Sequence, residues 1–229
     1  MKKSEEYVEN CGGIQPEPIL NNTTELVFIL DNSGSMAGME KDTIGGFNAM
    51  IEKQREVVGE VYVSTVLFNN SSRVIHDRIS IKRIEPMTEQ QYRVGGGTAL
   101  LDAIGGAIHH IGNVHKYARK EDVPAKTIFL ITTDGMENAS HQYSSEQVKK
   151  MIRRQEERYG WEFVFVAANI DAVHTAETIG IRRERAANYR QDAEGTEMLF
   201  CAMSEAVTSY RKGKKVSDSW SKNLDDENK

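Results

Sequence analysis

The sequence predicts an α/β fold, in which a doubly wound, mostly parallel sheet carries helices on both faces. Segments with the composition of buried strands alternate along the chain with segments of helical periodicity, a pattern typical of parallel sheets. Two of the apolar runs, at residues 26–30 and 127–133, are followed directly by an aspartate, Asp31 and Asp134. In such sheets, ligands bind at the carboxyl ends of the strands, near the point where the strand order reverses. If these two strands are neighbours, both carboxylates face one crevice.

The first half of the chain predicts three strands and two helices. The apolar run at 26–30 suits a strand that is buried on both faces. Residues 61–68 are rich in β-branched and aromatic residues and predict the second strand. Turn residues at 69–72 and the partial alternation that follows indicate an edge strand in a hairpin with it. The two helices are predicted from apolar residues at helical spacing. These residues are Ile44, Phe47, Met50, Ile51 and Val58 in the first helix, and Ile104, Ile108, Ile111 and Val114 in the second.

The second half continues the alternation. Residues 127–133 and 163–167 predict two further buried strands, and residues 187–189 a short last one. Ser144 and Gln147 form the capping-box pattern that begins a helix between the first two of these strands. A short helix runs from about residue 172 to a glycine at 180, and a long helix closes the domain. The apolar stripe of this closing helix is Leu199, Ala202, Met203, Ala206, Val207 and Tyr210.

Composition excludes several classes of protein. The 229 residues are 39% apolar with a mean hydropathy of −0.53, values that favour a soluble protein with a sizeable core. No apolar run approaches the roughly 20 residues that a membrane span needs, and no apolar stretch follows the N-terminal lysines as in a secretory signal. A net charge of −5 gives no general attraction to nucleic acid or to anionic lipid. Two cysteines are too few for a disulfide framework, so a cytoplasmic location is expected.

Three regions are expected along the chain. Residues 1–22 lack periodicity and contain glycine, proline and asparagine, which predicts an irregular leader. Residues 23–211 form the α/β domain. Residues 212–229 are mostly polar and charged, which predicts a disordered tail.

The residues that follow the first strand have the composition of a cation site. Asp31, Ser33 and Ser35 place three oxygen donors at alternate positions, and a glycine between the serines lets the loop bend tightly. Thr98 follows three glycines before a helix and adds a fourth oxygen donor, and Asp134 closes the set directly or through water. Hard cations such as Mg²⁺ and Mn²⁺ select oxygen ligands of these kinds.

The number of acids in this set matters more than the number of ligands. Two carboxylates at most neutralise a divalent ion, and three hydroxyls add no charge. An open coordination position on such an ion stays electrophilic and favours a carboxylate from outside. A cage of four acids would instead saturate the ion.

Three segments resemble the metal-ion-dependent adhesion site of von Willebrand factor type A (VWA) domains, in that family's order. They are Asp-Asn-Ser-Gly-Ser at 31–35, Gly-Gly-Thr-Ala-Leu at 96–100 and Thr-Asp-Gly at 133–135. The resemblance covers about residues 24–211 and implies a six-stranded sheet with one antiparallel edge strand. It also implies Mg²⁺ or Mn²⁺, with Ca²⁺ as an alternative, held by Ser33, Ser35 and Thr98, while Asp31 and Asp134 act largely through water.

In that family, a Glu or Asp of a partner protein completes the metal shell. Without a secretory signal or disulfides, the chain is most similar to the stand-alone intracellular prokaryotic members. We therefore expect a non-enzymatic domain that binds a protein or peptide acid through a divalent cation. An adaptor in an ATPase or chaperone-type assembly would use the same site. A metal-dependent phosphatase of the haloacid dehalogenase type is disfavoured, because that chemistry needs a second acid where this chain has Ser33.

Overall fold

The computed structural model describes residues 22–225, and the expected leader lies almost wholly outside this range. Six strands form one sheet: β1 (Thr24–Asp31), β2 (Val61–Phe68), β3 (Ser72–Ser80), β4 (Lys126–Thr133), β5 (Glu162–Ala167) and β6 (Ala186–Asn188). The helices are α1 (Glu40–Arg55), α2 (Leu100–Tyr117), α3 (Ser145–Tyr159), α4 (Ala172–Thr178), α5 (Ala193–Arg211) and α6 (Lys222–Asp225).

The strand order is β3-β2-β1-β4-β5-β6. All neighbouring strands are parallel except β2 and β3, which form the antiparallel edge. The doubly wound sheet with one antiparallel edge strand is therefore confirmed. From β1 the chain builds outward to β3 on one side and then, starting with β4, outward to β6 on the other. The strand order thus reverses between β1 and β4, the two strands that lead to the aspartates.

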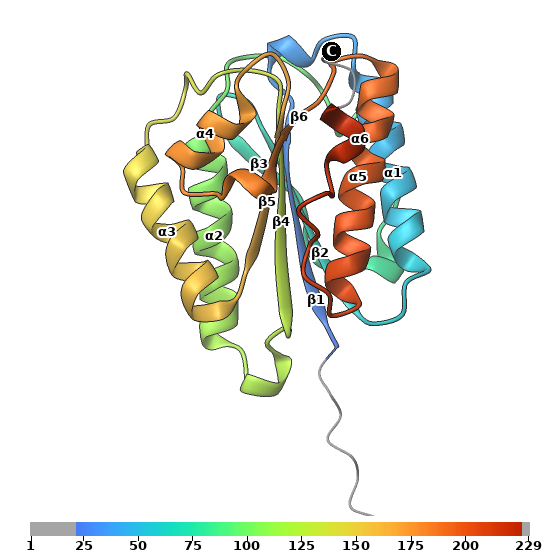
Figure 1. Ribbon diagram of the computed structural model, residues 1–229, viewed down its shortest axis with the longest axis vertical. Coiled ribbons are helices and arrows are strands. Elements are labelled where there is room, and N and C mark those ends of the chain that lie inside the picture. The colour runs from blue at the N-terminus through green and yellow to red at the C-terminus, as the bar shows by residue number, and fades with distance from the viewer. Residues whose placement is uncertain (1–21, 226–229) are drawn as a thin grey trace, which may run out of the picture.

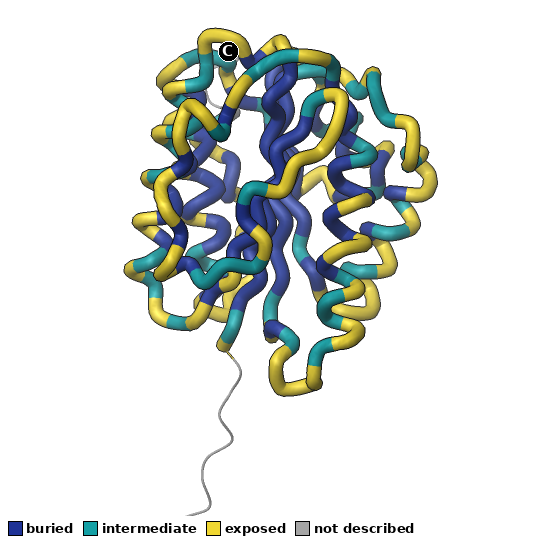
Figure 2. The backbone as a smooth tube through the Cα atoms, turned by 180° about the vertical axis from the view of Figure 1, so that it is seen from behind, coloured by how far each residue is buried: buried dark blue, intermediate teal, exposed yellow. Residues whose placement is uncertain are grey.

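Helices cover both faces of the sheet (Figure 1). Helices α2, α3 and α4 lie on one face, and α1, α5 and α6 lie on the other. Side chains along β1 alternate between the two cores: Phe28 packs toward α1 and α5, and Ile29 toward α2. The backbone of the central strands is buried along nearly its whole length (Figure 2), as expected for parallel strands covered on both sides.

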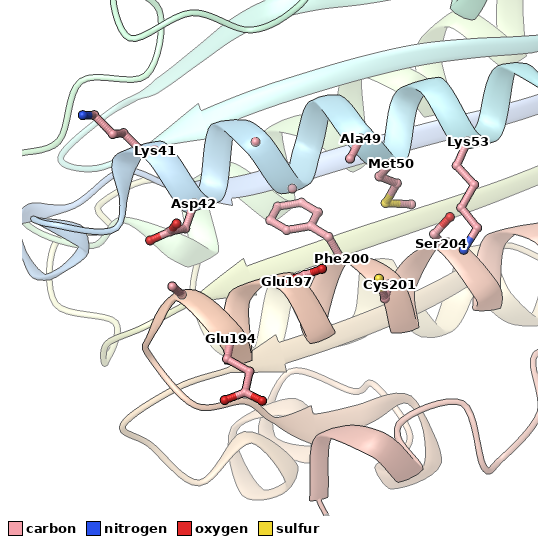
Figure 3. A pocket seen from close by; sticks show the side chains of 13 residues that line it. Lys41, Asp42, Ala49, Met50, Lys53, Glu194, Glu197, Phe200, Cys201 and Ser204 are labelled. Atoms are coloured by element: carbon pink, nitrogen blue, oxygen red, sulfur yellow. The ribbon is translucent and has the colours of Figure 1, made fainter.

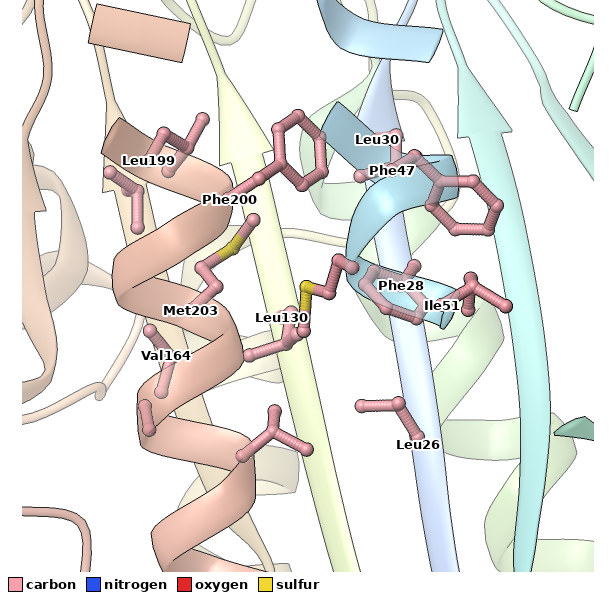
Figure 4. Packing of buried hydrophobic residues seen from close by; sticks show 14 of the residues in the cluster. Leu26, Phe28, Leu30, Phe47, Ile51, Leu130, Val164, Leu199, Phe200 and Met203 are labelled. Carbon is pink, nitrogen blue, oxygen red and sulfur yellow. The ribbon is translucent and has the colours of Figure 1, made fainter. Parts of the chain in front are cut away.

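The core between α1, α5 and the sheet is built on aromatic and aliphatic contacts (Figure 4). Phe47 of α1 meets Phe28 edge-to-face, with 5.0 Å between ring centroids. Phe200 of α5 points toward α1, where a Cβ on Gly46 would overlap its ring. A cavity of about 540 Å³ runs along the same two helices (Figure 3) and includes none of the expected metal ligands.

The segment after α5 differs from the predicted disordered tail. Val216 and Trp220 are buried, and the indole of Trp220 donates to the carbonyl of Glu184 over 2.9 Å. Arg185 donates to the Val216 carbonyl and to Asp218. The prediction failed because the segment is mostly polar, and its two buried apolar residues, four positions apart, form no pattern that composition reveals. Residues 226–229 of the expected tail lie outside the described range.

The helical periodicity of the sequence also assigned one apolar residue, Val58, to the first helix incorrectly. Helix α1 ends at Arg55, and Val58 lies in the following turn with 88% of its surface exposed. The remaining apolar positions expected in this helix face the core, with Phe47, Met50 and Ile51 all buried.

Candidate metal centre

Asp31, the last residue of β1, is fixed by hydrogen bonds on three sides. Its Oδ1 accepts from the backbone N–H of Ser33 over 2.7 Å, and its Oδ2 accepts from the Thr133 hydroxyl over 2.6 Å. The phenol of Tyr92 donates to its backbone carbonyl. The residue is only 1% exposed, so these donors set the direction of the carboxylate.

The two serine hydroxyls lie side by side above Asp31. Their Oγ atoms are 3.0 Å apart, and the Ser35 hydroxyl donates to Oδ1 of Asp134 over 2.6 Å. Because the Ser35 proton is directed at Asp134, the Ser33 hydroxyl is the donor between the two serines. Both oxygens keep lone pairs that can face a cation.

Thr98 reaches the same place from the loop that precedes α2. Its backbone N–H donates to Oδ1 of Asn138 over 2.8 Å, and its carbonyl accepts from the Asn138 N–H over 3.1 Å. A Cβ on Gly135 would lie 3.5 Å from Ser35 Oγ and 3.8 Å from Thr98 Oγ1, so both hydroxyls border one small space. The N–H of Gly34 also donates to the carbonyl of Gly96 over 3.0 Å and joins the two loops directly.

The glycine before this threonine is required by the backbone. Gly96 has φ of +80°, a left-handed conformation that side chains disfavour. A Cβ there would also press on the side chain of Asn70, which accepts a hydrogen bond from the N–H of Gly97 over 2.6 Å. The glycine run therefore lets the loop pass close to the end of β2 and carry Thr98 inward.

Asp31 and Asp134 are both 1% exposed, and within residues 22–225 no lysine or arginine forms an ion pair with either. Burial raises the pKa of Asp31, hydrogen bonds from Thr133 and Ser33 lower it, and the nearby charge of Asp134 raises it again. Two buried carboxylates without a cationic side chain are costly unless a cation compensates them.

The five residues expected at the site include only two acids. Within the described part of the chain, no three His, Cys, Asp or Glu side chains come together as a metal site. The structure brings the five expected residues, Asp31, Ser33, Ser35, Thr98 and Asp134, to one edge of the sheet. They contribute two carboxylates and three hydroxyls.

Two acidic side chains in the loops after β4 and β5, Glu137 and Asp171, have partners away from the metal space. Glu137 turns back to accept from the N–H groups of Leu101, Ala139 and Ser140, and therefore holds its own loop. Asp171 caps the start of α4 by accepting from the N–H of His174. Neither side chain is committed to the metal space.

Asp102, in the first turn of α2, binds backbone N–H groups of a neighbouring loop. Its carboxylate accepts from the N–H groups of His141, Gln142 and Tyr143. Partial burial raises the pKa of Asp102, but these three hydrogen bonds outweigh it and the pKa is lowered. The carboxylate thereby fixes the loop that carries Asn138.

Sequence reasoning missed the residues that hold the two aspartates. Thr133, Tyr92 and Gln191 each donate to Asp31 or Asp134; Thr133 lies in the Thr-Asp-Gly segment, whereas Tyr92 and Gln191 belong to no recognisable motif. Thr133 follows from its position, because it ends the strand next to β1. Gln191 comes from a loop about sixty residues away, and no local pattern marks it.

Comparisons with known proteins agree with this architecture. Residues 14–174 match the family model described as VWA domain containing CoxE-like protein. No curated protein matches the sequence significantly. None of the helices in residues 22–225 is long and apolar enough to cross a membrane.

Solved structures resemble the fold at low sequence identity. Proximal thread matrix protein 1 from the mussel byssus, in a form with a zinc occupied MIDAS motif, has a TM-score of 0.55 at 15% identity, covering 81% of this chain and 46% of that one. A von Willebrand factor type A protein from Catenulispora acidiphila scores 0.54 at 12% identity, covering 82% and 43%. The ArnB paralog VWA2 from Sulfolobus acidocaldarius scores 0.51 at 16% identity, covering 82% and 45%.

This chain spans less than half the length of those solved proteins, and at such identities the likeness concerns the fold alone. The family model is the stronger finding, since it extends over most of the chain, including β1, the glycine loop before α2 and the end of β4. The protein therefore belongs to the family of VWA domain containing CoxE-like proteins.

Proposed function

We propose that Asp31, Ser33, Ser35, Thr98 and Asp134 form a complete metal-ion-dependent adhesion site that captures an acidic residue of a partner protein. The hydroxyl pair of Ser33 and Ser35 carries the proposal. Its oxygens lie 3.0 Å apart and have lone pairs free toward the space that Thr98 borders.

The spacing of the two hydroxyls supports a small cation. Two oxygens at neighbouring octahedral positions around Mg²⁺ lie about 2.8–3.0 Å apart, because each Mg–O distance is about 2.0–2.1 Å. The observed 3.0 Å, which is also the length of the hydrogen bond between the two hydroxyls, is compatible with both serines holding such an ion.

The low number of acids at the site supports a bound ion that captures an external acid, rather than a site that only stores the ion. A bound divalent cation would supply an electrophilic position that the chain's own two carboxylates do not quench. Ser35 directs its proton at Oδ1 of Asp134, and Thr133 directs its proton at Oδ2 of Asp31. Both carboxylates thus share their charge with neutral donors, and an external Glu or Asp is the best remaining ligand.

We further propose that the domain is not an enzyme. Ser33 stands where a phosphatase of the haloacid dehalogenase type needs its general acid, and its hydroxyl is committed to the serine pair. We also propose that the domain works in the reducing cytoplasm, which is supported by the exposed thiol of Cys201 on α5, a side chain without a disulfide among residues 22–225.

The acid-capture step is tested with a short peptide that contains one glutamate and its glutamine counterpart. Charge-assisted contacts contribute about 1.5–3 kcal/mol, so the glutamate peptide should bind the Mn²⁺-loaded protein about tenfold or more tightly. Displacement of water from Mn²⁺, followed by water-proton relaxation, reports binding. Equal affinities for the two peptides, or an unchanged response after EDTA, would count against capture through the ion.

A further inference from the structure

Gln191 lies on the outer side of Asp134, in the loop between β6 and α5. Its Nε2 donates to Oδ2 of Asp134 over 2.6 Å and to the backbone carbonyl of Ser35 over 3.0 Å. The two oxygens of Asp134 therefore have separate partners: Oδ1 faces the Ser35 hydroxyl and Oδ2 faces the Gln191 amide. One side chain joins the loops that follow β1 and β4.

The orientation of this amide is fixed by a second amide. Oε1 of Gln191 accepts from Nδ2 of Asn169, which also approaches the Asp134 carbonyl at 3.4 Å. An amide oxygen cannot donate, so this contact leaves the NH₂ end of Gln191 directed at Asp134. Asn169 has φ of +58°, a conformation uncommon outside glycine and best tolerated by asparagine and aspartate. A strained backbone conformation persists only where the surrounding structure holds it, so Asn169 has a fixed position.

The backbone that carries Gln191 is also fixed. Asp192 caps α5 by accepting from the N–H of Gly195 over 2.7 Å. A Cβ on Gly195 would overlap the carbonyl of Arg190, so the loop passes against the first turn of the helix. Gln191 is thus held at its backbone by α5 and at its amide oxygen by Asn169.

From this geometry we infer that Gln191 is a positioning residue of the metal centre, one that holds Oδ2 of Asp134 so that only Oδ1 turns to the cation. The inference rests on the proposed metal site and assigns a role to a residue outside the adhesion motif. An amide suits this role, because it is neutral and its NH₂ end donates without ligating a cation. It orients Asp134 without adding a third negative charge to the site.

The inference predicts that Gln191→Leu weakens Mn²⁺ binding by about 10–100-fold, the usual effect of removing a partner of a metal-binding carboxylate. Leucine removes both N–H donors and keeps an unbranched Cβ. Gln90→Leu is the matched control, because Gln90 is exposed and has no hydrogen bond among the described residues. Dissociation constants for Mn²⁺ are measured by electron paramagnetic resonance of the free ion, and thermal unfolding in EDTA is measured in parallel.

A purely structural role would lower the unfolding temperature in EDTA without changing the Mn²⁺ constant beyond the control, and that result would overturn the inference. A double-mutant cycle gives an independent check. If Asn169 acts by orienting Gln191, Asn169→Ala should cost much less in the Gln191→Leu background than alone. Additive losses would contradict that link.

The outcome also separates this inference from the proposed function. Wild-type protein without affinity for Mn²⁺ would overturn the metal centre and the role of Gln191 together. Wild-type affinity that Gln191→Leu leaves intact would overturn the role of Gln191 alone.

Discussion

Ser35→Asp is expected to tighten Mn²⁺ binding at least tenfold and to abolish capture of the glutamate peptide. The new carboxylate would stand where the Ser35 hydroxyl now lies 3.0 Å from Ser33 Oγ and 2.6 Å from Asp134. One added charge about 4 Å from a unit charge contributes about 4 kcal/mol at an effective dielectric constant of about 20, and more toward a divalent ion. Residue 35 is exposed, so the larger side chain has room.

The added carboxylate is expected to change metal affinity and peptide capture in opposite directions. A third acid on the ion raises its affinity for the protein and lowers its demand for an external acid. Ser35→Asn is the matched control, since it has the same shape without the charge. Calorimetry with Mn²⁺ and the peptide titration measure both effects. Should Ser35→Asp bind Mn²⁺ no more tightly than Ser35→Asn, the charge argument would be wrong.

Arg211→Met is expected to destabilise the domain by about 3 kcal/mol or more. Arg211 is 4% exposed, and its guanidinium donates to the carbonyls of Gln54, Val57 and Gly59 and to the Gln54 side chain. These acceptors lie in the last turn of α1 and in the segment that follows it, so one side chain of α5 supplies hydrogen-bond donors to the end of the neighbouring helix and to its loop. Burial lowers the pKa of this guanidinium, and no carboxylate compensates it among residues 22–225.

Methionine fills part of the same volume but leaves these acceptors without donors. Each buried acceptor that loses its partner costs about 1–3 kcal/mol. Arg158→Met, at the exposed end of α3, is the control and should change stability by less than about 0.5 kcal/mol. Urea unfolding in EDTA measures both variants. A loss below 1 kcal/mol for Arg211→Met would show that the backbone of this corner is solvated instead.

The sequence predicted the strands and helices because their patterns are local. Runs of apolar residues mark strands buried on both faces, and Ser144 with Gln147 marked the start of α3 through a capping box that the structure contains. The approach of Asp31 and Asp134 was also predictable. Strands that run parallel end at the same edge, and β1 and β4 are neighbours where the order reverses.

Features that depend on contacts between distant segments could not be predicted in this way. The role of Gln191 requires knowledge of where the β6–α5 loop passes, and the burial of Trp220 requires knowledge that its segment packs on the core and contacts Glu184 and Arg185. The average composition of the segment after α5 is polar and therefore predicted a disordered tail. Periodicity likewise continued past the end of α1 and included Val58, because spacing alone does not locate the end of a helix.

The most direct test of the metal centre is calorimetry with Mg²⁺ and Mn²⁺ on the wild-type protein and on the Asp31→Ala, Ser33→Ala double variant. The double variant loses one carboxylate and one hydroxyl of the five-residue set, and circular dichroism verifies that it is folded. We expect one ion per chain for the wild type and no measurable binding for the variant. Equal binding by the two proteins, or none by the wild type, would contradict a cation held by these residues.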